Sequence, residues 1–434
     1  MQFTSTRDSK LSVSFSQAVR DCIPADGGVF IPSQIQDMRR WINYIDESTP
    51  FTSIAGSLTT AFMHDEFSPI ICETIAMDAF PKSPVVSQLD DNLFSMELFH
   101  GFTGYHKDYG VSYLCSYLEA TLTLTGGNVI FLDYTHGGLG ALLSRVLKGK
   151  KHIKAVLVYK KGTVRGIDED CLAWNGGNIY PLEMDGTEHE IKECVASVFA
   201  DRNLVEKFNL TVADSTNVCR LLAQIFFFPY SFAQIKKKVS GDIYYAIGPD
   251  TYGTLMAGLY SWRFALPLSG FLLPSTSALY ADPTGHPVIT DSVVDISHRG
   301  TMSAVSPANL ERLESFFRSN QLMMRNFVFP EDISEKQRDE AAKELYTKFG
   351  LFSSPETAEA YAVIRERGPE LFEDAAAVVL IAHNHPSLSA EYCRHVIGEA
   401  PETPDYISRS FEPVTLGRGL ITCADDIKSV IRSL

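Results

Sequence analysis

The chain has 434 residues, which is too long for one typical hydrophobic core, so its length predicts two or three domains. Hydrophobic residues at 45% and charged residues at 21% are typical of a globular protein and exclude a disordered or fibrous chain. The formal net charge of −15 argues against nucleic acid or an anionic membrane as the main partner. A phosphorylated substrate would have to be bound locally, by helix N-termini and loop amides.

Cysteine spacing and apolar runs indicate the compartment. The eight cysteines are scattered, with no C-x-x-C pair and no zinc spacing, so we expect reduced core thiols. Residues 1–5 lack the basic and apolar regions of a secretion signal. The densest apolar run, at 225–228, stops at Pro229 and is far shorter than the roughly 20 residues that span a bilayer. These features predict a soluble cytoplasmic protein.

The N-terminal part, up to about residue 88, mixes short strands and helices. A helix is predicted to start at 15–19, Asp26-Gly27-Gly28 forms a turn, and residues 29–32 read as a strand.

A lysine follows the next strand. Leu98 and Phe99 end an apolar stretch, Gly101 and Gly104 form a turn, and Lys107 stands where a helix begins. Ligands of α/β sheets bind at such junctions. The surrounding aromatics predict a half-buried amine whose pKa is lowered by desolvation, as a Schiff base with a carbonyl cofactor requires. The spacing alone fits a surface lysine at a helix N-terminus better than a Schiff-base lysine.

From about residue 89 the pattern alternates between strand and helix, which predicts parallel sheets. The expected strands are 129–132, 155–159, 179–182, 243–247 and 376–382, and the expected helices include 141–147, 187–199, 214–225 and one from 254. Residues 376–382 are apolar throughout, as in a strand buried on both faces. Residues 331–344 read as an exposed linker and helix.

Four strand-to-loop junctions stand out, at Lys107, 135–140, 248–253 and 383–386. The carboxyl ends of parallel strands meet at one crevice, and Gly-rich loops that open helices bind phosphates. Glycine after a strand is also ordinary turn chemistry, so the pattern alone leaves the two interpretations about even.

The segment Glu97-Leu-Phe-His-Gly, followed by Thr103 and Lys107-Asp-Tyr-Gly, closely resembles the pyridoxal-phosphate lysine segment of threonine synthases, E-L-F-H-G-P-T-x-A-F-K-D-F-G. Phe102 replaces the proline, and positions 105 and 106 differ. Ser5-Thr6-Arg7 and the D-G-G turn also match that family's opening motifs. The resemblance implies a fold-type II, tryptophan synthase β-like α/β fold with open parallel sheets and an N-terminal α+β domain. The expected domains are residues 1–88, a large domain of 89–125 with 226–434, and a small domain of 126–225.

The resemblance also assigns site residues. Lys107 is implied to be the Schiff-base lysine of pyridoxal 5'-phosphate and the proton carrier. The other implied cofactor-binding residues are Asn217, Gly248, Pro249, Asp250, Thr251, Tyr252, Gly253 and His383. The implied substrate-binding residues are Thr135, His136, Gly137, Gly138 and Arg220.

Several positions depart from the family pattern. The substrate loop T-S-G-D-T-G becomes residues 135–140, where His136 replaces the serine and Leu139 has no side-chain donor. In the cofactor-phosphate loop P-S-G-N-F-G-D a glycine becomes Asp250, whose charge would repel a phosphate if it pointed inward. His383 replaces the threonine that faces the pyridine nitrogen and could donate to or protonate it.

Two further segments extend the resemblance over nearly the whole chain. Residues 214–224 match N-S-x-N-S-I-N-x-x-R-L-L-x-Q, with Asp214 in place of the first asparagine. Residues 303–312 resemble M-D-V-x-x-P-S-N-x-x-R.

Metal and hydrolase chemistry are weaker alternatives. His383 and His385 form a conceivable metal pair, but no third ligand is evident nearby, so no metal is expected. The chain contains no G-x-S-x-G elbow, which argues against a serine hydrolase.

The resemblance implies a threonine synthase-like carbon–oxygen lyase that converts O-phosphohomoserine and water to threonine and phosphate. The drifted loops leave two alternatives open: a pyridoxal-phosphate lyase of the same fold with another amino-acid substrate, and a degenerate, non-catalytic paralogue. A small-molecule partner is expected, without nucleic acid or membrane, and the sequence leaves the oligomeric state open.

Overall fold

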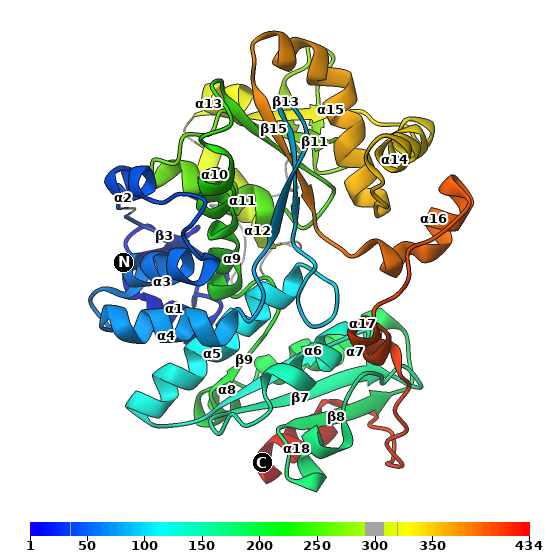
Figure 1. The fold of residues 1–434 in the computed structure, drawn as a ribbon. Helices are drawn as coiled ribbons and strands as arrows, with labels where there is room; N and C mark the ends of the chain where they lie inside the picture. Colours follow the sequence, from blue (N-terminus) through cyan, green and yellow to red (C-terminus); the bar gives the residue numbers. More distant parts are fainter. Residues whose placement is uncertain (35, 291–307, 319) are drawn as a thin grey trace.

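Three sheets organise the chain in the computed structural model, which describes residues 1–434 except 35, 291–307 and 319 (Figure 1). The first is a three-stranded antiparallel sheet in the order β2-β1-β3. Its strands are β1 (Gln2–Ser5), β2 (Val13–Ser14) and β3 (Phe30–Pro32). Helices α1 (Phe15–Asp21), α2 (Arg39–Tyr44), α3 (Phe51–Met63) and α4 (Pro69–Ala79) complete the N-terminal part. The strand predicted at 29–32 and the helix start at 15–19 are confirmed.

The second sheet has six strands in the order β14-β11-β10-β15-β5-β4. They are β4 (Val85–Asp90), β5 (Leu93–Glu97), β10 (Ile243–Ile247), β11 (Gly270–Pro274), β14 (Val328–Glu331) and β15 (Ala377–Ala382). All neighbours are parallel except β4 and β5. β15 lies in the middle and is buried along its whole length, as its continuous apolar sequence predicts.

The chain segments between and after these strands also contain a small hairpin and further helices. The hairpin is β12 (Leu279–Ala281) with β13 (Pro287–Ile289). The helices are α5 (Lys107–Thr125), α9 (Val218–Ile225), α10 (Phe227–Ile235), α11 (Gly253–Arg263), α12 (Ala308–Phe317), α13 (Gln321–Phe327), α14 (Glu335–Phe349), α15 (Pro355–Glu373), α16 (Ala390–Ile397) and α17 (Asp405–Ser408).

The third sheet is parallel, with four strands in the order β8-β7-β6-β9, and lies below the six-stranded sheet in Figure 1. Its strands are β6 (Val129–Tyr134), β7 (Ile153–Lys160), β8 (Ile179–Met184) and β9 (Leu210–Thr211). Its helices are α6 (Gly138–Val146), α7 (Glu188–Phe199), α8 (Arg202–Phe208) and α18 (Ala424–Ser433). The two parallel sheets confirm the predicted fold class.

The domain limits expected from sequence differ from this arrangement in two places. Residue 88 falls inside β4, which pairs with β5 and so belongs to the six-stranded sheet. The C-terminal residues leave the large domain: Ile421 bridges Met184 of β8, and α18 packs against α7. An apolar strip on α18, with Ile427 and Ile431 buried, accounts for this docking.

Two expected elements also have different bounds. The helix expected from 214 begins at Val218, because Asn217 caps it by accepting a hydrogen bond from the Cys219 amide. From sequence, Glu331 was expected to start an exposed linker, but it is the last residue of β14, which pairs with β11. This strand covers only four positions, which is too short a pattern to indicate a strand from sequence.

The Ser5-Thr6-Arg7 motif ties the N-terminal sheet to α12. Glu311 is fully buried, and its carboxylate accepts hydrogen bonds from the Thr6 hydroxyl at 2.6 Å and from the Arg7 guanidinium at 3.0 Å. Arg312, next along the helix, donates to the backbone carbonyls of Phe30 and Thr216. These contacts explain the second half of the 303–312 motif, whose residues 303–307 lie outside the described part.

An aromatic cluster joins the helices that pack around α5. Phe226 is fully buried. Its ring centroid lies 6.0 Å from those of Phe62 and Phe80 and 5.2 Å from that of Tyr113. The helical stretch Val218–Ile235 is long and apolar enough by composition to cross a membrane, but 78% of it is buried inside the protein. It is therefore a core segment.

Phe226→Ala is expected to lower the free energy of unfolding by about 3–5 kcal/mol, because it removes a fully buried ring from this cluster. Urea unfolding followed by circular dichroism measures the change. Tyr44, whose side chain is 86% exposed, provides the control: Tyr44→Ala should stay within about 0.5 kcal/mol of the parent. Equal effects of the two substitutions would contradict the assignment of this core.

Candidate functional site

Backbone hydrogen bonds join the loop after β5 to the loop after β15. The Leu98 amide donates to Ala382 at 2.9 Å, and the His106 amide donates to the His383 carbonyl at 2.8 Å. In the other direction the His385 amide donates to the Gly104 carbonyl at 2.8 Å. The pairing of the two strands therefore continues beyond their carboxyl ends, and the structure brings together the junctions at Lys107 and at 383–386.

Asp108 holds the shape of the loop that precedes Lys107. One carboxylate oxygen accepts a hydrogen bond from the Thr103 amide and the other from the Thr103 hydroxyl, both at 2.6 Å. A Cβ on Gly101 would lie 2.6 Å from Asp108, so only glycine fits beside the carboxyl. Asp108 therefore requires both neighbours: Gly101 leaves room for its carboxyl group, and Thr103 donates the hydrogen bonds that hold it. Sequence reasoning gave Thr103 and Asp108 no role, although they stand in the matched motif.

Lys107 starts α5 and is exposed. The expectation of a half-buried lysine is wrong, because the aromatic side chains nearby turn into the core: Tyr109 is buried against Phe51, Phe80 and Phe227. Among the residues that the structure describes, Lys107 makes no hydrogen bond or ion pair. Its amine is therefore accessible and has no part in holding the fold together.

His106, Asp250 and His383 form a buried polar cluster beside Lys107. The Nε2 atom of His106 lies 3.7 Å from Oδ2 of Asp250, and the two imidazole rings have centroids 4.4 Å apart. The Thr254 hydroxyl lies 3.0 Å from Nε2 of His383. The carboxylate of Asp250 thus points inward, the orientation in which it repels a phosphate.

Burial sets the charge state of this cluster. It lowers the pKa of His106 to about 3, with His383 adding to the effect, and it also lowers the pKa of His383. Burial opposes ionisation of Asp250 as well, but the neighbouring imidazoles and Lys107 keep the pKa of that carboxyl below its usual value. Burial thus disfavours charge on both imidazoles, while the basic groups beside Asp250 favour its carboxylate form.

The loop 248–253 connects β10 to α11, as predicted. Tyr252 has a left-handed backbone with φ +60°, and its hydroxyl lies 2.5 Å from the hydroxyl of Thr276. Gly253 opens α11, and a Cβ there would lie 3.0 Å from Gln224. The first turn of α11 therefore packs closely against Gln224, and its second residue, Thr254, contacts His383 of the polar cluster. Gly248, Pro249 and Thr251 complete the loop.

The loop 135–140 connects β6 to α6, but its side chains are largely engaged. The Thr135 hydroxyl accepts a hydrogen bond from the Gly137 amide at 3.0 Å. His136 is exposed and lies 3.2 Å from Glu188. Gly138 opens α6, which leaves the amides of its first turn as the donors that this loop offers.

Arg165 lies against this loop and was missed from sequence. A Cβ on Gly137 would come within 2.3 Å of its Nε atom, and that buried Nε has no hydrogen-bond partner among the described residues. The Arg165 guanidinium also stacks over Phe411 at 4.8 Å. Its position after β7, at the carboxyl edge of the same sheet, is the signal that could have identified it.

Asn217 and Arg220 are enclosed in the protein. The Asn217 amide is fully buried; it caps α9 and donates to the Val19 carbonyl at 3.1 Å. Arg220 is buried and donates to the Ala213 carbonyl at 2.7 Å, while its Nε remains without a partner in the described chain. Their assignment to cofactor and substrate stays a prediction.

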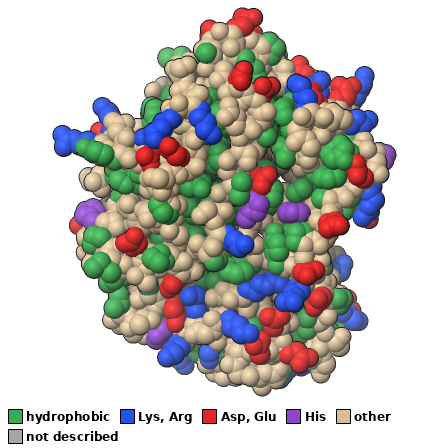
Figure 2. Space-filling model, in the orientation of Figure 1, with side chains coloured by type: hydrophobic (Ala, Val, Ile, Leu, Met, Phe, Trp, Pro, Cys, Tyr) green, Lys and Arg blue, Asp and Glu red, His purple; other side chains and the backbone are tan. Residues whose placement is uncertain are grey.

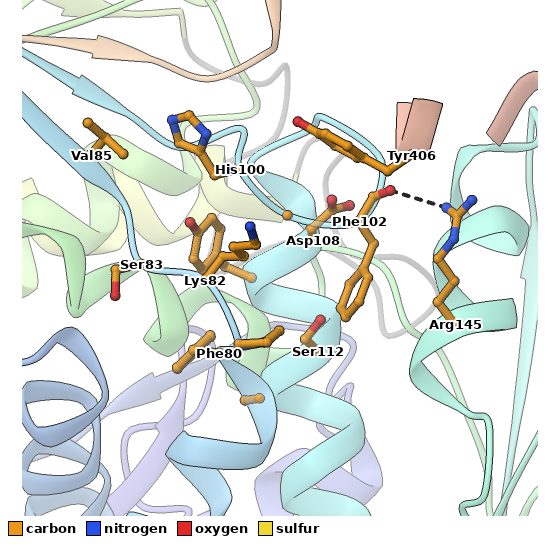
Figure 3. Close-up of a pocket in the computed structure, with 14 residues that line it drawn as sticks. Phe80, Lys82, Ser83, Val85, His100, Phe102, Asp108, Ser112, Arg145 and Tyr406 are labelled. Atoms are coloured by element: carbon orange, nitrogen blue, oxygen red, sulfur yellow. Dashed lines mark hydrogen bonds between the residues drawn. The ribbon is translucent and has the colours of Figure 1, made fainter. Parts of the chain in front are cut away.

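A cavity of about 590 Å³ opens beside the lysine loop (Figure 3). His100, Phe102 and Asp108 line it from that loop, and Lys82 and Arg145 add positive charge. Arg145 donates to the Phe102 carbonyl at 3.1 Å, the contact drawn in Figure 3. Figure 2 shows His, Lys and Arg side chains together near the middle of this face. The cavity therefore has basic side chains in its wall, in a protein of net negative charge.

Comparison with known proteins agrees with this architecture. The family model "Threonine synthase N terminus" matches residues 2–80. Threonine synthase of Escherichia coli is 26% identical over 431 residues, covering 97% of this chain and 96% of that protein. Threonine synthase of Haemophilus influenzae is 26% identical over 400 residues, covering 91% of each chain.

Solved structures give the same fold. The crystal structure of E. coli threonine synthase covers the whole of both chains with a TM-score of 0.77 and 23% identity. The structure of threonine synthase from Brucella melitensis with bound PLP covers 100% of this chain and 99% of that one, with a TM-score of 0.80 and 18% identity. The fold is therefore that of the fold-type II pyridoxal-phosphate enzymes. Within that class, the chain is similar over nearly its whole length to threonine synthases, and its first 80 residues match the N-terminal model of that family.

Gly101→Ala is expected to destabilise the protein by about 1–3 kcal/mol, because the added methyl displaces Asp108 and the loop that it holds. Gly138→Ala is the matched control, since a Cβ there meets nothing within 4 Å and alanine favours a helix start. Chemical denaturation of the two variants measures the difference. A Gly101→Ala protein as stable as Gly138→Ala would refute the steric role of Gly101.

The pH dependence of stability tests Asp108. Burial raises its pKa to about 6, despite the hydrogen bonds from Thr103, whereas an aspartate in the unfolded chain titrates near about 3.9. Between these values the folded protein holds a proton that the unfolded chain has released. The free energy of unfolding of the parent, relative to Asp108→Asn, should therefore fall as the pH rises from about 4 to about 6. A rise over that window would contradict the assignment.

Proposed function

We propose that the protein is a threonine synthase-like lyase that uses pyridoxal phosphate and converts O-phosphohomoserine and water to threonine and phosphate. The observation that carries the proposal is the position of Lys107. Its amine is exposed at the start of α5, after a loop whose shape is held by hydrogen bonds between Thr103 and Asp108, and it has no structural partner among the described residues. The fold does not need this amine, although the neighbouring residues of the motif are structural. We therefore infer that the amine has a catalytic role.

The residues around Lys107 fit the cofactor at several positions. An accessible primary amine suits an aldehyde, and the amides that open α11 suit a phosphate. Three buried polar atoms near this amine have no hydrogen-bond partner in the described chain: Nδ1 of His106, Oδ2 of Asp250 and Oδ1 of Asn384. Buried polar groups are ordinarily satisfied, so such atoms indicate a polar ligand. Asp250 is the departure, since its charge opposes a phosphate.

In this proposal pyridoxal phosphate, when bound, supplies an electron sink for charge that develops at the substrate Cα. Lys107 Nζ would take the Cα proton and could return it. His383 is a buried ring near this amine, and the Thr254 hydroxyl, 3.0 Å from its Nε2 atom, fixes its orientation. Asp108 and Thr103 keep the lysine backbone in place while the side chain moves.

A substrate phosphate would be bound mainly by backbone and by Arg165. The first-turn amides of α6 are free of partners within the helix, and the Arg165 guanidinium lies against Gly137 at that point. This local positive potential supports a phosphorylated substrate in a chain with a net charge of −15.

The engaged side chains of the same loop favour the second candidate, a pyridoxal-phosphate lyase that acts on an unphosphorylated amino acid. Thr135 is used within the loop and His136 turns outward to Glu188, so neither hydroxyl nor imidazole is directed at a substrate phosphate. The third candidate, a non-catalytic paralogue, is supported by Asp250.

An absorbance scan from 300 to 500 nm with added pyridoxal phosphate tests the proposal. The parent is expected to show an imine band near about 420 nm, and Lys107→Ala should lose it because the amine is gone. Lys107→Arg is the control that keeps the positive charge and should also lose the band.

Phosphate release then separates the candidates. Turnover of O-phosphohomoserine supports the first, and turnover of only an unphosphorylated hydroxyamino acid supports the second. A protein that shows no band at saturating cofactor is the non-catalytic paralogue.

A further inference from the structure

Three departures from the family pattern meet at one point in the structure. His106, Asp250 and His383 come from three distant segments, where the family motifs have phenylalanine, glycine and threonine. Each offers a ligating atom, and these atoms all lie within 4.8 Å of one another. From this geometry we propose that the three side chains form a binding site for a divalent transition-metal cation.

The distances suit a metal ion. Zinc binds imidazole nitrogen and carboxylate oxygen at about 2.0–2.2 Å, which puts ligand atoms roughly 3.4 Å apart in a tetrahedral site. One pair here, Nε2 of His106 and Oδ2 of Asp250, is 3.7 Å apart, and all three ligand atoms lie within 4.8 Å of one another. The three side chains therefore have to move closer together to bind an ion.

A buried polar atom points to a missing ligand. The Oδ2 atom of Asp250 is buried and has no hydrogen-bond partner among the described residues. His106, whose Nε2 atom lies 3.7 Å from this oxygen, is 5% exposed. A carboxylate oxygen enclosed beside imidazole nitrogens in this way is one that a bound cation satisfies.

A second layer of contacts orients the ligands. The Thr254 hydroxyl donates to Oε1 of Gln224 at 3.0 Å, so it can only accept from Nε2–H of His383. This hydrogen bond leaves Nδ1 of His383 with the lone pair that a metal requires. Metal-binding histidines ordinarily donate their other ring N–H in this way. The backbone bond from His106 to His383 holds the two rings side by side.

Two imidazoles and one carboxylate favour zinc, iron, cobalt or nickel over magnesium or calcium. Three protein ligands also leave coordination positions open, as in metal sites that bind a water or a substrate oxygen. The sequence alone suggested His383 with His385, but His385 bonds to Ser387 at 2.8 Å and stacks edge-on against Phe99. The other two ligands come from segments that only the fold brings close.

A second group, Asp168, Asp170 and Cys171, has similar spacing but is largely exposed. Asp170 there already pairs with Lys148 at 2.7 Å, so its charge is compensated. That group carries no metal proposal and serves as a control.

Titration of the protein, freed of metal by chelator, with Co²⁺ and Zn²⁺ tests the site. We expect one equivalent of Co²⁺ to bind, with visible ligand-field absorption, and Zn²⁺ to displace it. His106→Phe, Asp250→Gly and His383→Thr restore the family residues and should each weaken binding by more than about 100-fold. Thr254→Val should weaken it by about 10–100-fold, the usual effect of losing an outer partner.

Two variants are the controls: His189→Gln removes an exposed histidine and Asp170→Asn alters the second group, and both should bind as the parent does. Absence of stoichiometric Co²⁺ binding would overturn the proposal, as would loss of binding in Asp170→Asn rather than in the three ligand variants. The titration contains no pyridoxal phosphate and no substrate. Its result therefore does not depend on the 420 nm scan. The metal site and the proposed lyase activity can each be disproved separately.

Discussion

The candidate site depends on the pairing of β15 with both of its neighbours in the middle of the six-stranded sheet. β10 and β5 lie on either side of β15 and run parallel to it, so their three carboxyl ends meet. The backbone bonds that join Gly104 and His106 to the loop after β15 extend this pairing beyond the strands. Lys107, Asp250 and His383 are therefore placed by main-chain hydrogen bonds rather than by the side chains that differ between relatives. Such a frame tolerates exchange of site residues without loss of the fold.

Periodicity and turn residues were sufficient to predict most strands and the fold class, since β6, β7, β8, β10 and β15 are short apolar runs bounded by glycine or polar residues. Periodicity and turn residues were not sufficient to predict the environment of Lys107. The side chain of Tyr109 turns into the core because it packs against rings from α3, from the end of α4 and from α10. Arg165 and His106 were missed for a related reason. Each is inconspicuous in its own segment, and only tertiary contacts bring it to Gly137 or to Asp250.

The lysine motif has two kinds of residue. Gly101, Thr103 and Asp108 fit one another by close contact and hydrogen bonds, so a protein that had lost all catalytic activity would still need them. Their resemblance to the family pattern is thus no argument for chemistry. Lys107 is different, because its exposed amine contributes nothing that the described structure requires. The case against a non-catalytic paralogue rests on this one side chain.

Asp250 is the point at which the fold and the chemistry of the family disagree. The amides that open α11 favour an anion, and a carboxylate already provides one there. A phosphate dianion added beside it meets like charge in a buried setting, where screening is weak. A bound cation resolves this conflict, because it compensates Asp250 and leaves the helix N-terminus free to bind a phosphate. In this interpretation Asp250, His106 and His383 are one combined change that creates a cation site. They are not three separate losses of family residues.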